Sequence, residues 1–201
     1  MRKIAAFTIS VVFLLTSASL AFCGPFGLEM GMSLSQINQR LVRPAELING
    51  DRYKVIPKNA HDFFVAYEVV VDQKYGLYEI QATSRDVPDT DYGFTTIRWF
   101  ENIEEYLKEI YGNCRTLDYS KHRDGDLKIN VLSEIIERSR RLSKIWDRET
   151  SKLPSAIEEI YLVVNAKYQY GMYYGYLTLS YLSDKWEVIY TEKLKTQKLF
   201  F

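Results

Sequence analysis

The chain has 201 residues, and its 26 Lys and Arg residues balance 26 Asp and Glu residues, so its formal net charge is zero. Proteins that hold nucleic acid or an anionic membrane by bulk electrostatics carry a basic excess, so this balance argues against both classes of partner. Apolar residues make up 47 % of the chain and charged residues 26 %, which is typical of a folded domain. The 2 His and 2 Cys residues leave few candidates for a nucleophile, a general base or a transition-metal ligand.

The N-terminus has the three parts of a secretory signal peptide. Met1–Lys3 is positively charged, Ile4–Leu15 is almost wholly apolar, and Ser19–Ala21 supplies small residues for cleavage. The apolar run is shorter than the ~20 residues that a membrane-spanning helix needs. We therefore expect residues 1–21 to be removed and residues 22–201 to form a single exported domain, slightly acidic and without a membrane span.

The two cysteines, Cys23 and Cys114, have three possible fates in an exported protein. A disulfide between them is permitted in that compartment and would hold down the new N-terminus, whereas the simpler alternative is two unpaired thiols. Cys23 also stands where a bacterial lipoprotein carries its acylated cysteine. The bulky Phe22 before it disfavours a lipid anchor, so we expect the disulfide or the free thiols instead.

The first half of the domain predicts a short helix and a hairpin. Ser33 is a helix-capping residue followed by apolar residues at helical spacing, and the helix is expected to end before Pro44. Phe63–Asp72 is rich in Val, Phe and Tyr, and Leu77–Thr83 alternates between apolar and polar residues. These two runs predict an antiparallel hairpin with Gly76 in its turn.

Two longer helices are predicted in the middle of the chain. Apolar residues recur at steps of three and four over Ile97–Tyr111, and Gly112 follows as a helix terminator. A second apolar stripe runs over Leu132–Trp146, and Pro154 closes that helix. Its remaining surface is rich in basic residues interleaved with acids, which favours a solvated face with local ion pairs over contact with an anionic surface. These basic residues are Arg138, Arg140, Arg141, Lys144 and Arg148.

The last part of the chain predicts a second hairpin and a final helix. Ile160–Val164 and Tyr173–Leu182 alternate on either side of a turn at Gly171. Trp186–Leu194 fits a helix opened by Asp184, although its β-branched residues would also tolerate a strand. The resulting fold class is α+β, with an antiparallel sheet built from two hairpins, helices packed on one face, and two αββ-like halves.

The segment Phe26–Ile37 carries a family resemblance. Its Gly-Met-Ser sequence, followed by Ile37, resembles the Gly-Met-Thr/Ser-x-x-x-Val opening of the outer-membrane assembly lipoprotein family once called small protein A, and is similar to exported proteins of the β-lactamase-inhibitor-protein-like fold. In that family the helix ends in Leu-Gly-x-Pro, whereas Leu41–Pro44 has Val42 in place of the glycine. The resemblance implies a non-enzymatic module that binds other proteins in the periplasm or envelope of a Gram-negative bacterium.

The candidates for catalysis are weak. Cys114, Asp118 and His122 are the residue types of a thiol nucleophile, an orienting acid and a base, but Cys114 follows a predicted helix C-terminus, where the helix dipole disfavours a thiolate. We expect no enzyme. A small hydrolase using Cys114 and His122 is the alternative, and a structural envelope protein without a discrete site is another.

Other polar motifs predict neither a cofactor nor a metal. His122–Asp124 resembles part of a kinase catalytic loop, but the other kinase motifs are absent from the sequence. Four aspartates could offer oxygen ligands to calcium, yet none stands in the spacing of a calcium loop, and loop solvation or helix capping explains them better. They are Asp89, Asp91, Asp124 and Asp126.

The tyrosines of the second hairpin are the strongest binding candidates. If the alternating apolar residues face the core, then Tyr161, Tyr174, Tyr176 and Thr178 lie together on the opposite face. Tyrosine gives a large contact area with a polar tip, which suits contact with a protein or a carbohydrate. The simpler interpretation is that tyrosine is a common strand residue covered by its neighbours. We hypothesise that these four residues bind another envelope protein.

Overall fold

The computed structural model describes residues 24–120 and 130–198. The helices are α1 (Leu34–Gln39), α2 (Phe94–Tyr111), α3 (Val131–Ile136) and α4 (Trp186–Lys198), with a 3-10 turn at Pro25–Gly27. The strands are β1 (Glu46–Asn49), β2 (Arg52–Val55), β3 (Phe64–Asp72), β4 (Gly76–Ser84), β5 (Val87–Asp89), β6 (Arg115–Ser120), β7 (Arg140–Asp147), β8 (Ile157–Gln169) and β9 (Met172–Ser183).

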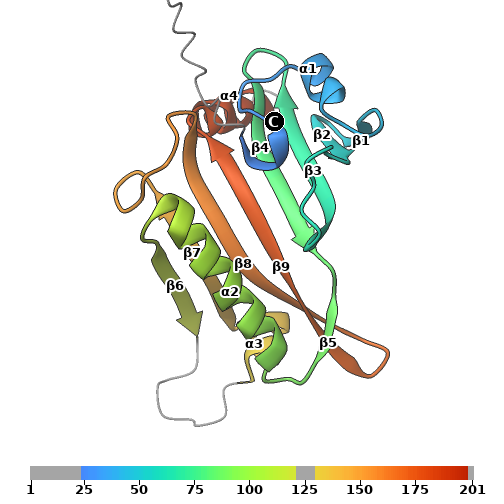
Figure 1. Ribbon diagram of the computed structural model, residues 1–201, viewed down its shortest axis with the longest axis vertical. Coiled ribbons are helices and arrows are strands. Elements are labelled where there is room, and N and C mark those ends of the chain that lie inside the picture. Colours follow the sequence, from blue (N-terminus) through green and yellow to red (C-terminus); the bar gives the residue numbers. More distant parts are fainter. Residues whose placement is uncertain (1–23, 121–129, 199–201) are drawn as a thin grey trace, which may run out of the picture.

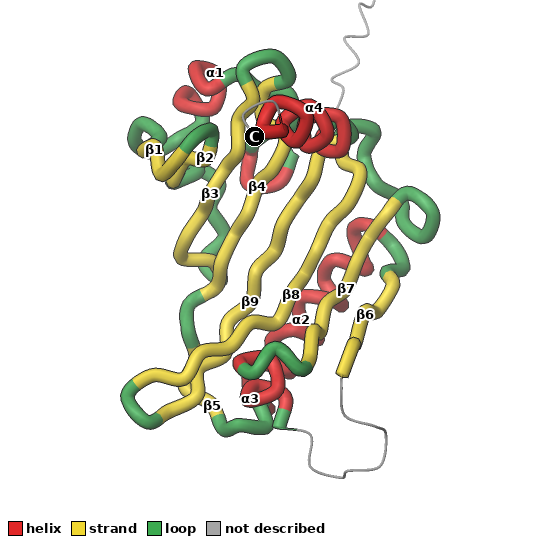
Figure 2. Tube along the Cα trace, turned by 180° about the vertical axis from the view of Figure 1, so that it is seen from behind, coloured by secondary structure: helices red, strands yellow, loops and turns green. Residues whose placement is uncertain are grey.

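The strands form one antiparallel sheet, which dominates the described part of the chain (Figure 1). Its order is β1-β2-β3-β4-β9-β8-β7-β6, and β5 pairs with β9 beyond the end of β4. Figure 1 shows α2 lying across one face of β7, β8 and β9. Figure 2 shows the opposite face, with β4, β9, β8 and β7 running across it and α4 at one end.

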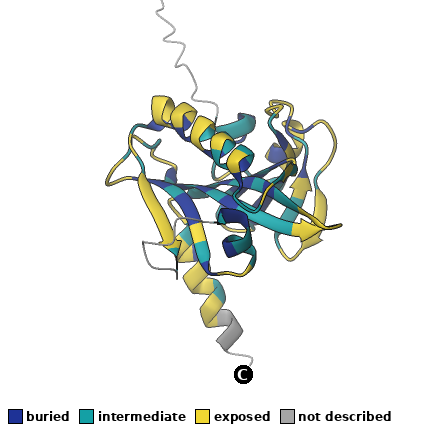
Figure 3. Cartoon of the chain, turned by 90° about the horizontal axis from the view of Figure 1, so that it is seen from below, coloured by how far each residue is buried: buried dark blue, intermediate teal, exposed yellow. Residues whose placement is uncertain are grey.

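The long β8–β9 hairpin supplies much of the core, and its alternation is as the sequence predicted. Across the pair, core-facing residues lie opposite one another, for example Leu162 opposite Leu179. The residues on this face are buried: Ile160, Leu162, Val164, Leu177, Leu179 and Tyr181. α2 covers them with Phe100, Leu107 and Tyr111, which are also buried, and its outer side is exposed (Figure 3).

Close approach of α2 to the sheet depends on Gly175 in β9. A Cβ at this position would lie only 1.9 Å from Oγ1 of Thr96 in the first turn of α2. Thr96 is itself fixed, since its backbone N–H and its hydroxyl both donate to Oδ2 of Asp89 at 2.8 Å. The glycine therefore lets β9 and the start of α2 meet without a side chain between them.

The segment with the Gly-Met-Ser sequence fastens the N-terminal part of the domain to β4. Gly31 donates its N–H to the carbonyl of Leu77 at 2.8 Å, and Leu77 donates to the carbonyl of Met32 at 2.8 Å. Ser33 then forms a capping box with Gln36, which begins α1 as predicted. The residues that carry the family resemblance thus have a local structural role in this fold.

Several predicted elements are confirmed. The first hairpin is β3 and β4, in which Val69 lies opposite Ile80, and Gly76 at its turn has a φ of 72°. The helix over Ile97–Tyr111 is α2, which stops at Gly112 with a φ of 82°. The final segment is helical, as α4, rather than a strand.

The predicted fold class is wrong. An α+β fold with a sheet of two hairpins and two αββ-like halves was expected, whereas the described residues form one nine-stranded sheet with four short or moderate α-helices. The strands that the sequence did not reveal are β1, β2, β5, β6 and β7. Most of these are short, and β1 and β6 have exposed rather than alternating residues, so they lack the period that marks a strand.

The predicted helix over Leu132–Trp146 is also wrong. α3 ends at Ile136, the chain turns at Arg138 with a φ of 57°, and β7 follows between β6 and β8. Leu142 and Trp146 are four residues apart, a spacing that places two side chains on one side of either a helix or a strand. The basic residues expected on one helix face consequently divide between the two faces of the sheet.

A variant of Trp146 tests whether this segment is the buried strand β7. In β7, Trp146 lies fully buried in the core, and its Nε1–H donates to the carbonyl of Gly112 at 3.0 Å. Trp146→Ala is expected to lower the free energy of unfolding by about 3–5 kcal/mol, measured by urea denaturation. Leu117→Ala, on the neighbouring edge strand and 42 % exposed, is the control and should cost less than about 1 kcal/mol. Similar losses for both variants would contradict this packing.

Candidate functional site

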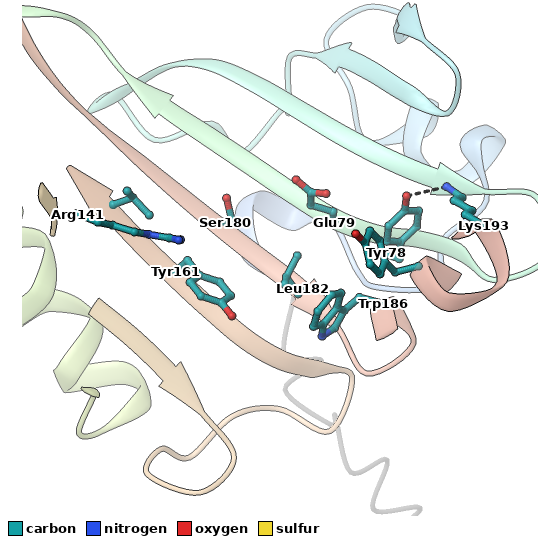
Figure 4. Close-up of a pocket in the computed structure, with 10 residues that line it drawn as sticks. Tyr78, Glu79, Arg141, Tyr161, Ser180, Leu182, Trp186 and Lys193 are labelled. Carbon is teal, nitrogen blue, oxygen red and sulfur yellow. Dashed lines mark hydrogen bonds between the residues drawn. The ribbon is translucent and has the colours of Figure 1, made fainter. Parts of the chain in front are cut away.

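The face of the sheet opposite α2 is the open face. On β8 and β9 it carries Tyr161, Val163, Tyr174, Tyr176, Thr178 and Ser180. A pocket of about 390 Å³ lies on this face beside α4, and it is lined by residues of β4, β7, β8, β9 and α4 (Figure 4). Pockets for small ligands have volumes of about 300–1,000 Å³, so this one lies near the lower end of that range.

The pocket lining is mainly aromatic and aliphatic. Leu182 and Val163 form part of its floor. Its aromatic residues come from three elements and are Tyr78, Tyr161, Trp186 and Tyr190. Figure 4 shows the rings of Tyr161 and Trp186 around the same space, with Leu182 between them. Rings of this kind offer flat apolar surface together with polar edges.

A polar cluster fastens α4 over the sheet. Lys193 of α4 donates to the hydroxyl of Tyr78 at 2.9 Å (Figure 4). Lys193 also forms an ion pair with Asp51, which accepts from the Tyr78 hydroxyl at 3.2 Å. Burial opposes the charge on Lys193, but the hydrogen bonds to Asp51 and Tyr78 outweigh it and raise the pKa of the ammonium group. Ile189 adds an apolar anchor, since it is almost fully buried.

Two other polar groups at the pocket also have partners in the fold. Glu79 forms an ion pair with Arg52 at 3.2 Å. Tyr161 donates its hydroxyl hydrogen to Glu159. Burial, followed by the hydrogen bond and the charge of Glu159, raises the pKa of Tyr161 well above its usual value, so the ring is neutral at physiological pH.

Arg141 differs from these groups. It stands on β7, where it lies opposite Tyr119 of β6, and at the edge of the pocket. Its side chain is exposed and forms no hydrogen bond or ion pair with the described residues. Its positive charge acts on Tyr161, whose pKa it lowers against the larger effect of burial. Figure 4 shows the Arg141 side chain running toward the Tyr161 ring. Its guanidinium group is therefore available to a ligand.

The four residues predicted as a binding face do share the open face. Tyr174 lies opposite Lys167, Tyr176 opposite Asn165 and Thr178 opposite Val163, all on the side away from α2. They are half-buried, and Thr178 accepts a hydrogen bond from Asn165 at 2.9 Å. Tyr161 lines the pocket, while the other three residues continue along the two strands away from it.

The sequence did not reveal the other half of the pocket. The sequence predicts no site role for four residues of its lining, and it places Arg141 on a helix. The four are Tyr78, Trp186, Tyr190 and Lys193. They meet because α4 folds back over strands that are far away in sequence, as in the contact between Tyr78 and Lys193. No local sequence pattern indicates this encounter.

The other basic residues near Arg141 have different surroundings. Arg140 pairs with Asp118 at 2.7 Å and Lys144 pairs with Glu104 at 2.9 Å. Arg148 forms an ion pair of 2.8 Å with Glu158. These residues thus form the local ion pairs that the sequence favours, but with residues of β6, α2 and β8 rather than along one helix face.

The Cys/His alternative gains no support from the surroundings of Cys114. Burial raises the pKa of the Cys114 thiol, and the charge of Glu104, whose Oε1 lies 3.6 Å from Sγ, raises it further. Asp118, the predicted orienting acid, is paired with Arg140. Cys114 forms no disulfide among the described residues, while its predicted partners Cys23 and His122 lie outside them.

The candidate metal ligands have structural roles where they are described. Asp89 caps the start of α2, and the carbonyl of Asp91 accepts the N–H of Leu132 at 2.9 Å. Asp124 and Asp126 lie outside the described residues. Residues 24–120 and 130–198 contain no group of three or more His, Cys, Asp or Glu side chains placed to hold a metal ion. No helix in the same ranges is long and apolar enough to cross a membrane.

Comparison with known proteins shows one partial likeness. No family model and no solved structure matches the chain. Two proteins named chaperone protein HtpG, from Mycobacterium avium (strain 104) and Mycolicibacterium paratuberculosis (strain ATCC BAA-968 / K-10), are each 25 % identical over 138 residues, which is 64 % of this chain. The match spans about a fifth of the length of these relatives, 21 % in each case, so it shows neither a family nor an activity for this chain.

The raised pKa of Cys114 gives a test with a definite sign. In a Cys23→Ser background, Glu104→Gln removes a negative charge that disfavours the thiolate, so the thiol pKa should fall and iodoacetamide should react faster at pH 8, by about threefold or more. Glu105→Gln, at an exposed position next along α2, is the control and should leave the rate unchanged. Rapid alkylation of the unmodified Cys114 at pH 6 would instead indicate an activated nucleophile.

Proposed function

We propose that this protein is an exported, non-enzymatic module of the bacterial envelope that binds another protein through the open face of its sheet. The observation that carries the proposal is the difference between the two faces of β8 and β9. One face is buried under α2, and the other presents Tyr161, Tyr174, Tyr176 and Thr178 beside an aromatic pocket.

The residue types on this face suit protein recognition. Tyrosine and tryptophan contribute large contact areas at a low cost in side-chain entropy, and they are enriched among the residues that dominate binding energy. A strand also holds their positions more precisely than a loop does. A partner would therefore meet a rigid surface with aromatic anchors, and the polar tips of Tyr174 and Tyr176 would remain able to form hydrogen bonds.

The cellular location rests on the N-terminal sequence and on the family resemblance. Residues 1–21 have the pattern of a signal peptide, and the Gly-Met-Ser segment is similar to the opening of exported assembly proteins. A binding role in the envelope fits both features. The Cys/His hydrolase is the less favoured function, because burial and Glu104 keep the Cys114 thiol protonated.

The test is capture from a periplasmic extract with residues 22–201 as bait, followed by repetition with the captured protein in purified form. Tyr174→Ser with Tyr176→Ser is expected to reduce capture at least tenfold, because two aromatic contacts of about 1 kcal/mol or more each are lost. Unfolding midpoints should stay close to that of the parent protein, since both side chains lie outside the core.

Tyr106→Ser is the matched control for that experiment. Tyr106 is 53 % exposed and lies on α2, on the other side of the sheet. This variant should capture the partner as the parent does. Capture that survives loss of Tyr174 and Tyr176 would reject the open face as the binding surface.

A further inference from the structure

We infer that the pocket beneath α4 is the anchor site for a short acidic peptide segment of the partner. In this arrangement an aromatic or large aliphatic side chain enters the pocket, and a neighbouring carboxylate pairs with Arg141. The inference rests on the proposed function, since it names the chemistry of the segment that the open face would recognise.

The shape and lining of the pocket favour an apolar anchor. Its volume of about 390 Å³ lies near the lower end of the range for ligand sites, so one bulky side chain and its adjacent backbone would fill much of it. Trp186 and Tyr161 flank this space and Leu182 lies between them (Figure 4). Such surfaces gain most from contact with another ring or a branched aliphatic side chain.

The charges around the pocket favour an acidic residue in the segment, next to its apolar anchor. Lys193 is already engaged with Asp51 and Tyr78, and Glu79 is engaged with Arg52. Arg141 makes no ion pair with the described residues, so the lining offers one unneutralised positive charge. A guanidinium group binds a carboxylate through two parallel hydrogen bonds, which makes an acidic residue beside the anchor the complementary choice.

The surroundings of the pocket favour a peptide over a compact small molecule. From Tyr174 to Leu182 along β9, alternate residues face outward, and at about 3.3 Å per residue this row extends about 26 Å. The row leads from the tyrosines of the open face into the pocket. An extended segment of about eight residues would match its length, with its anchor at the α4 end.

The test uses synthetic peptides of defined sequence and isotope-labelled residues 22–201. The probe is acetyl-Gly-Asp-Phe-Gly-amide, and its two controls replace Asp by Asn or Phe by Ala. In an NMR titration the probe should shift the signals of Arg141, Tyr161, Leu182 and the Trp186 indole in a saturable manner. Each control peptide should bind about tenfold more weakly, because it lacks either the charge or the ring.

Arg141→Gln supplies the matching change in the protein. Arg141 is exposed and outside the core, so its loss should leave folding intact. The variant should bind the Asp probe about tenfold more weakly and no longer distinguish it from the Asn control. Arg98→Gln, an exposed position on α2 away from the pocket, should bind like the parent protein.

Three results would overturn the inference. They are no saturable shifts at the pocket, equal binding of the Asp and Asn peptides by the parent protein, or a response of the same signals to dodecanoate or maltotriose without any response to the peptides. If these occur while capture of the partner still depends on Tyr174 and Tyr176, the pocket inference fails and the proposed function stands. If capture is independent of those tyrosines, the proposed function fails.

Discussion

The β8–β9 hairpin packs against α2 through one face only, and the rest of the structure follows from this constraint. Its inward residues are apolar and buried, among them Ile160, Leu162 and Leu179, and burial of each contributes about 1.5–3 kcal/mol. Strand alternation then fixes which residues face the other way. The tyrosines of the open face are therefore held in place by packing on the opposite side of the sheet. This packing does not involve a binding partner.

α4 converts part of this open face into a pocket. The helix is anchored by Ile189 and by the cluster of Lys193, Asp51 and Tyr78, so its aromatic residues stand over the strand ends. These contacts engage the charge of Lys193, whereas the side chain of Arg141 has no ion pair with the described residues. The pocket thus combines a largely apolar lining with one cation that has no ion pair among the described residues. A segment with both an apolar side chain and a carboxylate would match it better than a segment with only one of them.

The sequence predicts the parts of this protein that depend on local periodicity. Alternation in the β8–β9 hairpin was sufficient to place Tyr161 and Tyr176 on the face away from the core, and helical spacing was sufficient for α2. The sequence does not predict β7, because Leu142 and Trp146 fit both the helical and the strand period, and Arg141 is then expected on a helix. The pocket could not be predicted, since it joins residues such as Tyr78 and Lys193 that meet only through the tertiary fold.

If the open face is the binding surface, a partner must cover it. Hydroxyl-radical footprinting of residues 22–201, alone and with the purified captured partner, measures this cover. We expect Tyr161, Tyr174 and Tyr176 to be modified in the free protein and protected in the complex, while Tyr106 on α2 is modified equally in both. Protection of Tyr106 with continued modification of the three open-face tyrosines would contradict this expectation.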